Sequence, residues 1–322
     1  MRTDKDLESQ IVALRNKGYS SRQVALMLLG RESRKSTVND IYNRYLTREG
    51  RYALNECGED GPNIFVFDIE TSAAMVYAFA RFDVNISQAQ IVQEIMMLGV
   101  VGKWLGSNKN IEIYPRNFKN WDDPLEQYFM LSKIHQLLDK ADIVVAHNGD
   151  RFDIKMLNAF FIRAGLPKPS PYRSVDTLKI AKRYFKFPSN SLDNLGEYLG
   201  LGRKVQHGGF SLWKGCMVGD TESFKKMIEY NHQDVDLLEA IYLKLRPWDH
   251  LHPNVSFHYE DFHTQSDQLC GVCGSSDMED TGKMSFTNTM AYPLYKCNSC
   301  GAWHKMSQSI KLNQKPLTGV NK

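Results

Sequence analysis

The sequence predicts an α/β core between two small modules, an all-α module at the N-terminus and a cysteine-rich module near the C-terminus. Three observations carry this prediction. Short apolar runs alternate with amphipathic segments between residues 63 and 248. Residues 1–50 show helical periodicity without strand-like runs. Four cysteines in paired CxxC units fall within residues 267–308.

Bulk composition fits a globular protein of about two domains. The chain has 322 residues, of which 42% are hydrophobic and 24% charged, so it can bury a sizeable core. Its net charge of +3 says little about partners, but both ends are basic: residues 1–51 carry 11 Lys/Arg against 6 Asp/Glu, and no acid follows Cys300. Basic ends suit a polyanionic partner, although terminal segments are also often charged simply because they are solvated.

Neither membrane insertion nor secretion is indicated. No stretch approaches the ~20 apolar residues of a membrane span, and the initial MRTDKDLESQ lacks the apolar centre of a signal peptide. We therefore expect a cytoplasmic protein without a membrane partner. In a reducing compartment the paired cysteines favour a metal over disulfides, while Cys57 and Cys216 stand alone.

Residues 1–50 are predicted to form a helix-turn-helix-like module, followed by a polar linker at 51–62. Apolar residues from Leu7 to Leu14 follow helical spacing, NKGYSS supplies a turn, SRQVALMLLG predicts a second helix, and a third follows RESRKS. This order is typical of DNA-binding helix-turn-helix units, but also of docking or oligomerisation bundles. For DNA binding, the expected contacts are Arg34, Lys35, Asn39, Asn43 and Arg44.

The core at 63–248 begins with strands and continues with helices. Strands are predicted in IFVFDI, EIMMLGVVGKW, IEIY and ADIVVAH, and helices over about 124–138, 153–165, 176–186, 191–199 and 221–244. This order predicts an α/β or α+β sheet with helices packed against it. Residues 249–266 are predicted as a linker. Its histidines are expected to be solvated rather than metal-bound: His250, His252, His258 and His263.

Two acids on the first predicted strand are candidate metal ligands. Asp68 and Glu70 are two residues apart, so both side chains share a face of the strand. The buried run IFVF argues against plain solvent-exposed acids on an edge strand. A divalent cation stabilises two neighbouring carboxylates, and carboxylates suit Mg²⁺ or Mn²⁺.

Later segments add polar residues that could join these acids. Asp153 stands at a predicted helix start, where either metal binding or plain capping is favourable for an anion. Asn148, in the preceding turn, can donate a hydrogen bond. Tyr230 and Asp234 are i and i+4 on the last predicted helix and so share a face. Asp176 is expected mainly to cap the next helix, with support of the site as the alternative.

Together these segments resemble the DEDD exonuclease superfamily, which has a ribonuclease H-like fold with a mixed sheet flanked by helices. FDIET is similar to the first family motif, N…FD to the second and YxxxD to the third, and the tyrosine resembles that of the DEDDy subgroup. Residues 63–248 are similar to the proofreading domains of family B DNA polymerases. SLDNLGEYLGL also looks like this family, and WKGCMVGD and MIEYNHQDVDLLEAIYLKLRPW resemble phage-encoded stand-alone members, which implies the host cytoplasm.

The resemblance implies a two-metal 3′–5′ exonuclease that releases nucleoside 5′-monophosphates. The implied ligands of two Mg²⁺ or Mn²⁺ ions are Asp68, Glu70, Asp153 and Asp234. Asp68 would bridge both ions, Glu70 and Asp234 would complete one shell, and Asp153 would hold the other ion directly or through water. Tyr230 would orient the attacking water or help to deprotonate it. Implied nucleic-acid contacts in the core are Thr71 and Asn148.

Single-stranded DNA is the favoured substrate, because the nearest resemblance is to proofreading domains. An RNA-directed exonuclease is the first alternative, and a DNA-binding regulatory protein with a silent nuclease fold is the second. Structure-selective endonuclease activity is a third, which rests on the flanking modules alone. A proofreading role would require a separate DNA polymerase or replication factor as partner.

A zinc ribbon over residues 267–308 is predicted by the pairs Cys270-x2-Cys273 and Cys297-x2-Cys300, each followed by glycine. Four thiolates complete the shell of one structural Zn²⁺ and leave no open position for catalysis. The metal would fold a segment that is too small for its own core. Trp303 and Lys305 are candidate nucleic-acid contacts, with local packing of Trp303 as the alternative. A basic tail follows at 309–322.

Overall fold

The structure is a computed structural model, and it describes residues 4–16, 21–38, 41, 61–203, 209–259 and 268–310. The chain divides into two compact units: Asn63–Leu245 forms one, and Met1–Pro62 with Arg246–Lys322 forms the other. Within the described ranges, no helix has both the length and the apolar character that a bilayer crossing needs.

The larger unit is built on a five-stranded mixed sheet with the order β5-β4-β1-β6-β7. Its strands are β1 (Ile64–Thr71), β4 (Met97–Trp104), β5 (Ile111–Ile113), β6 (Ile143–Ala146) and β7 (Arg173–Asp176). β4 is antiparallel to both β1 and β5, whereas β6 and β7 continue parallel to β1. This sheet confirms the predicted fold class, an α/β unit with a ribonuclease H-like mixed sheet.

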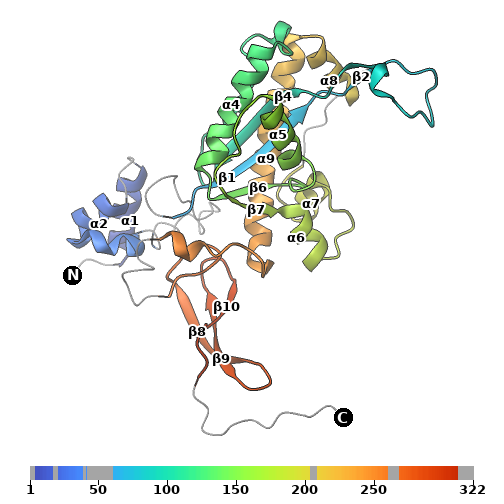
Figure 1. Cartoon of the computed structure of the whole chain (residues 1–322). Helices are drawn as coiled ribbons and strands as arrows, with labels where there is room; N and C mark the ends of the chain where they lie inside the picture. Colours follow the sequence, from blue (N-terminus) through green and yellow to red (C-terminus); the bar gives the residue numbers. More distant parts are fainter. Residues whose placement is uncertain are drawn as a thin grey trace, which may run out of the picture. The chain divides into compact units, whose positions relative to one another are not determined.

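Helices flank the sheet (Figure 1). They are α4 (Pro124–Lys140), α5 (Asp153–Arg163), α6 (Thr177–Tyr184), α7 (Leu192–Tyr198), α8 (Phe210–Met217) and α9 (Thr221–Leu245), with η3 (Phe118–Asn120) before α4. Phe65, Phe67 and Ile69 of β1 join a buried core with residues of α4 and α5. Since strand side chains alternate, Asp68 and Glu70 point to the other face of β1, and α9 packs against both β1 and β4.

Most core elements predicted from sequence are present, with ends shifted by a few residues. The prediction missed β7 and α8. Only Val175 in the sequence of β7 is strongly apolar, and this short strand is defined by its parallel pairing with β6. Sequence periodicity gave no strand there because the stabilising contacts are tertiary.

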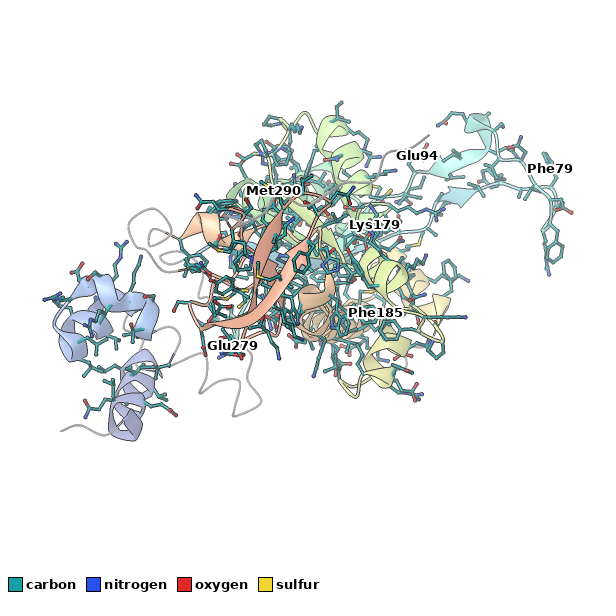
Figure 2. The ribbon with its side chains drawn as sticks, turned by 90° about the horizontal axis from the view of Figure 1, so that it is seen from below. Phe79, Glu94, Lys179, Phe185, Glu279 and Met290 are labelled. Atoms are coloured by element: carbon teal, nitrogen blue, oxygen red, sulfur yellow. The ribbon has the colours of Figure 1, made fainter. Side chains whose placement is uncertain are left out.

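The prediction also missed an arm between β1 and β4. It consists of β2 (Met75–Val76), η2 (Gln88–Gln90) and β3 (Ile91–Gln93), with β2 antiparallel to β3. The amide of Tyr77 donates to the carbonyl of Gln90 at 2.8 Å, and Ser87 and Gln90 form a capping box. In Figure 2, Phe79 lies at the outer end of this arm and Glu94 lies near its base. The side chain of Phe79 is fully exposed.

The N-terminal segment contains α1 (Asp4–Asn16), α2 (Ser21–Leu29) and η1 (Glu32–Arg34), and residues 35–38 are helical. Its small apolar core consists of Ile11, Val24, Ala25 and Val38. Helices α1 and α2 are the two helices that the spacing of apolar residues predicted. Three of the predicted DNA contacts, Asn39, Asn43 and Arg44, lie outside the described residues.

After α9 the chain forms η4 (Arg246–Trp248) and η5 (Val255–His258). In the predicted linker His252 is half-buried, with Nδ1 2.8 Å from the carbonyl oxygen of Pro253. Burial, helped by the charge of Arg246, lowers the pKa of His252 to about 4. His263 lies outside the described residues.

The cysteine-rich segment forms a three-stranded antiparallel sheet. Its strands are β8 (Met278–Phe286), β9 (Ala291–Cys297) and β10 (Trp303–Lys305), in the order β10-β9-β8. The turn that begins at Cys270 precedes this sheet, and the amide of Val255 donates to the carbonyl of Gly271 in that turn at 2.8 Å. Part of the predicted linker is therefore packed against the cysteine turn.

Candidate functional site

Three carboxylates from two elements converge on one face of the large sheet. Asp68 and Glu70 come from β1 and Asp234 from α9, and one oxygen of each lies within 4.8 Å of the others. Glu70 is 7% exposed and Asp234 is 2% exposed, while Asp68 is half-buried. Anions held this closely at low exposure repel one another. The donor set therefore fits a hard divalent cation, whose preferred ligands are carboxylate oxygens.

The fourth predicted carboxylate, Asp153, lies beside the same strand. It begins α5, as expected, and its Oδ1 accepts a hydrogen bond from the amide of Ile69 at 3.3 Å. Parallel pairing of β1 with β6 covers only Ile64–Val66, so the next part of this strand edge is available to a side chain. Desolvation raises the pKa of Asp153 to about 6, although the hydrogen bond from Ile69 opposes this.

Asp176 holds the turn that leads to Asp153. It caps α6, as predicted, because its Oδ1 accepts from the amide of Leu178 at 3.0 Å. The same oxygen accepts from the amide of Asn148 at 2.9 Å. Asn148 has a φ of +66°, a conformation that asparagine tolerates better than most residues. The capping role and the supporting role, which were alternatives from sequence, are therefore combined in one carboxylate.

Tyr230 lies one helical turn before Asp234 on α9, so both residues are on the same face of the helix. The tyrosine is 9% exposed, and its ring packs edge-on against Trp213 of α8 with centroids 6.2 Å apart. Helix α8 therefore helps to fix the tyrosine predicted to act at the site.

The fold and the site agree with the result of the sequence comparison. The sequence profile of the RNase_H superfamily matches residues 65–246, which is more than half of the chain. The chain belongs to the RNase_H superfamily. Membership in this superfamily, together with the acidic triad, supports a nuclease that acts on nucleic acid with divalent metals.

One solved structure similar to this chain is the family B DNA polymerase from the hyperthermophilic archaeon Pyrobaculum calidifontis. The TM-score is 0.42 at 15% sequence identity, and the match covers 60% of this chain. The chain spans 26% of the polymerase, about a quarter of its length. No curated protein matches the chain.

Beside Glu70, on the same face of the sheet, the RNase_H domain contains a buried pair that sequence reasoning missed. Asn231 Nδ2 donates to the hydroxyl of Tyr114 at 3.3 Å. A Cβ at Gly99 would lie 2.2 Å from the Tyr114 ring, and Gly99 is the β4 partner of Glu70. Burial and then the charge of Glu70 raise the pKa of Tyr114, so the phenol stays protonated. A glycine inside a predicted strand was the available signal, because it marks a close approach.

Lys103 of β4 connects the sheet to α9, the helix that carries Asp234. Its Nζ lies 2.9 Å from Asp236 and 2.7 Å from Glu239, and it is 7% exposed. Burial tends to lower the pKa of Lys103, but the two carboxylates outweigh this effect and raise it. The ion pairs fix the helix against the strand that neighbours β1.

Four sulfur atoms form a second cluster near the C-terminal end of the described chain. The atoms, which lie within 4.8 Å of one another, belong to Cys270, Cys273, Cys297 and Cys300. Hydrogen bonds from the thiols of Cys270 and Cys273 lower the pKa of Cys297. Sulfur ligands in this number suit a structural metal site such as tetrahedral zinc.

The two cysteine turns have the same backbone hydrogen bonds. The amide of Cys270 donates to the carbonyl of Ser275 at 2.8 Å, and that of Gly274 donates back to Cys270 at 2.8 Å. In the second turn Cys297 donates to Ala302 and Gly301 donates to Cys297, both at 2.9 Å. The two glycines have φ values of +76° and +82°, so the glycine after each CxxC pair has a conformational reason.

The other predicted nucleic-acid contacts differ in exposure. Thr71 ends β1 beside Glu70 and is half-buried, and Arg34 is exposed in η1. Lys35 is only 5% exposed, so its side chain is poorly placed to reach a phosphate. Trp303 is 47% exposed and Lys305 is exposed, both on β10.

Proposed function

We propose that the chain is a metal-dependent 3′–5′ exonuclease that removes nucleoside 5′-monophosphates from nucleic acid, with single-stranded DNA as the favoured substrate. The observation that carries the proposal is the convergence of Asp68, Glu70 and Asp234 within 4.8 Å. Asp153 supports it, because its carboxylate is bonded to the strand between the two β1 acids.

The residues of the chain have separate tasks in this proposal. Asp68, Glu70 and Asp234 would hold one Mg²⁺ or Mn²⁺, and Asp153 with Asp68 would hold the other. When bound, these ions lower the pKa of a water and stabilise charge on the attacking and leaving oxygens. Tyr230, fixed by Trp213, orients the attacking water by hydrogen bonding.

The polarity of degradation and the preference for DNA rest on the resemblance of the motifs to DEDD exonucleases. A silent nuclease fold is disfavoured because all four carboxylates and Tyr230 are present. RNA remains the alternative substrate, and the assay below distinguishes it. We further propose that the cysteine cluster holds one structural Zn²⁺ and that the N-terminal helices bind nucleic acid.

The test uses 5′-labelled single-stranded DNA, duplex DNA and RNA of matched sequence with Mg²⁺, Mn²⁺ or EDTA. We expect stepwise shortening from the 3′ end of single-stranded DNA, abolished by EDTA. Asp68→Asn should lower the rate by more than about 100-fold, beyond the roughly 10- to 100-fold cost of losing an outer contact to a metal ligand. Glu229→Gln is the control, an exposed acid of α9 next to Tyr230.

The results divide the alternatives clearly. Full cleavage by Asp68→Asn would overturn the proposed site, and faster digestion of RNA would replace the DNA assignment. Internal fragments from a circular single strand would indicate endonuclease action. Deletion of residues 1–50 should weaken binding to long substrates and leave the activity on short oligonucleotides unchanged. Unchanged binding to long substrates would instead favour a docking role for those helices.

A further inference from the structure

We propose that one face of the C-terminal three-stranded sheet binds single-stranded nucleic acid. This face, which we call the lysine face, is made up of the side chains of Lys283, Tyr292, Lys296, Trp303 and Lys305. Figure 2 shows β8 and β9 as two long strands, with Glu279 at one end of the sheet and Met290 at the hairpin end. The choice of a single strand as occupant rests on the proposed exonuclease function.

Strand register places four of these side chains on the same side of the sheet, and a ring contact adds Lys283 to them. Trp303 pairs with Lys296, and Lys305 pairs with Leu294. Directly paired residues in an antiparallel sheet point to the same face, as do residues two apart along a strand. Tyr292 follows this alternation on β9. Lys283 lies in β8 where the pairing with β9 shifts, between Asp280 and Met284, and its contact with the Trp303 ring places its Nζ on this side.

The opposite face of the same sheet supports the cysteine cluster. His304 lies between Trp303 and Lys305 and points the other way, with Nε2 3.1 Å from Cys270 Sγ. Cys297 ends β9 and contributes its sulfur on that side. The packing of the ribbon therefore uses one face and leaves the lysine face without a role in holding the metal.

Lysine and aromatic side chains alternate across the lysine face. Lys283 Nζ lies 5.3 Å from the centre of the Trp303 ring, and Lys305 Nζ lies 5.0 Å from the centre of the Tyr292 ring. These cation–π contacts hold the charges beside the rings instead of beside carboxylates. The only acid paired into this face from β8 is Glu279, opposite Lys296, so the face is net positive.

This combination suits an unpaired strand better than a duplex. Aromatic rings bind nucleic acid by stacking on base faces, which a duplex hides, while lysines contact phosphates in either form. Trp303 is 47% exposed, so part of its ring can be covered by a base. Strand β9 has 7 residues and spans about 20 Å, room for roughly four nucleotides.

The first test measures binding of a labelled oligothymidylate of about 20 nucleotides to full-length protein inactivated by Asp68→Asn, in EDTA-free buffer. A Lys283→Gln/Lys296→Gln/Lys305→Gln variant should bind at least about tenfold more weakly. Its dependence of log K on log salt should be shallower by roughly 0.7 per lost phosphate contact. Glu279→Gln is the matched control on the same face and should bind more tightly.

The second test isolates stacking. Trp303→Leu should weaken binding of the oligothymidylate by about tenfold. It should also remove the quenching of tryptophan fluorescence that accompanies binding to the parent protein. Trp248→Leu, at another exposed tryptophan, should keep both the affinity and the fluorescence quenching of the parent protein. Zinc content must match the parent protein in every variant, which separates loss of the face from unfolding of the ribbon.

Several outcomes would overturn the inference. Unchanged affinity and salt dependence in the lysine variant would do so, as would tighter binding of a duplex of the same sequence. The lysine variant should lose affinity for oligothymidylate and for oligouridylate to the same extent, since stacking and phosphate contacts do not distinguish deoxyribose from ribose. If the lysine substitutions weaken binding but leave the exonuclease rate on short oligonucleotides unchanged, the lysine face is supported independently of the active site. If the parent protein binds the oligonucleotide but has no nuclease activity, the proposed exonuclease function is overturned and the lysine face is not.

Discussion

The amide of Ile69 donates a hydrogen bond to Asp153 Oδ1 at 3.3 Å, which ties the strand carrying Asp68 and Glu70 to the first turn of α5. The bond exists because β6 pairs with β1 only up to Val66. A side chain thus satisfies a strand amide where the neighbouring strand does not. Its carboxylate has two separable properties, an acceptor oxygen and a negative charge.

Asp153→Asn separates these properties, because asparagine keeps an acceptor for Ile69 and loses the charge. We expect the nuclease rate to fall by more than about 100-fold, since the proposed metal role needs the anion. The melting temperature in EDTA above pH 6 should be equal or higher, because a buried anion is no longer desolvated. Asp150→Asn, in the preceding turn and bonded to Lys179, is the control. Full activity of Asp153→Asn would show that the site uses only the oxygen.

The raised pKa of Asp153 predicts how the stability of the metal-free protein depends on pH. Its folded pKa is about 6 against a usual value of 3.8, so the folded state binds the proton more tightly than the unfolded state. Stability from this group is present below pH 3.8 and is lost as pH rises through about 6. The size is roughly 3 kcal/mol at most. Urea unfolding in EDTA should show this fall in the parent protein and a flatter profile in Asp153→Asn.

Tyr114→Phe tests the buried layer beside Glu70. The substitution keeps the ring that lies against Gly99 and removes the hydroxyl that accepts from Asn231. We expect a loss of about 1–2 kcal/mol in unfolding free energy, because a buried amide donor loses its acceptor. Affinity for Mn²⁺, measured by titration, should fall by roughly tenfold if this layer positions Glu70. Tyr128→Phe, at a half-exposed tyrosine of α4, should change neither quantity.

Much of the fold followed from sequence because its core elements carry local signals. The apolar run from Phe65 to Phe67 indicates a buried strand, and the helical spacing of Tyr230 and Asp234 places both on one face of a helix. The arm around Phe79 and the strand ending at Asp176 carry no such signal. The first exposes apolar residues, and the second is polar, so each depends on pairing that periodicity does not record.

The site was predictable where ligands share an element and unpredictable where contacts cross elements. Asp68 with Glu70 follows from strand alternation. The bond from Ile69 to Asp153 depends on where β6 stops pairing, and the approach of Tyr114 depends on the register that pairs Gly99 with Glu70. Register and strand ends are tertiary outcomes, and a single sequence does not specify them.

The cysteine cluster predicts a defined response to loss of one sulfur. Cys297→Ser should lose about one zinc per chain by metal analysis, because three thiolates and a hydroxyl hold zinc poorly. The ribbon should then become sensitive to protease, since metal binding supplies its folding free energy. Cys216→Ser is the control, a buried cysteine of α8 outside the cluster. An unchanged zinc content in Cys297→Ser would remove the metal assignment.

Lys103→Met tests the ion pairs that hold α9 against β4. Glu239 is largely buried and accepts from the amide of Gly106 at 2.9 Å, so loss of the lysine leaves it without its buried cation. Removing one partner of a buried pair costs about 3–5 kcal/mol, and the exposed carboxylate of Asp236 brings the expectation to the lower end. Lys225→Met breaks an exposed i,i+3 pair on the same helix and should cost less than about 0.5 kcal/mol. Urea unfolding gives both values, and equal losses would show that burial of the Lys103 pair adds nothing. The nuclease rate of the folded Lys103→Met protein should fall with the metal affinity, because the helix that positions Asp234 has lost its anchor to the sheet.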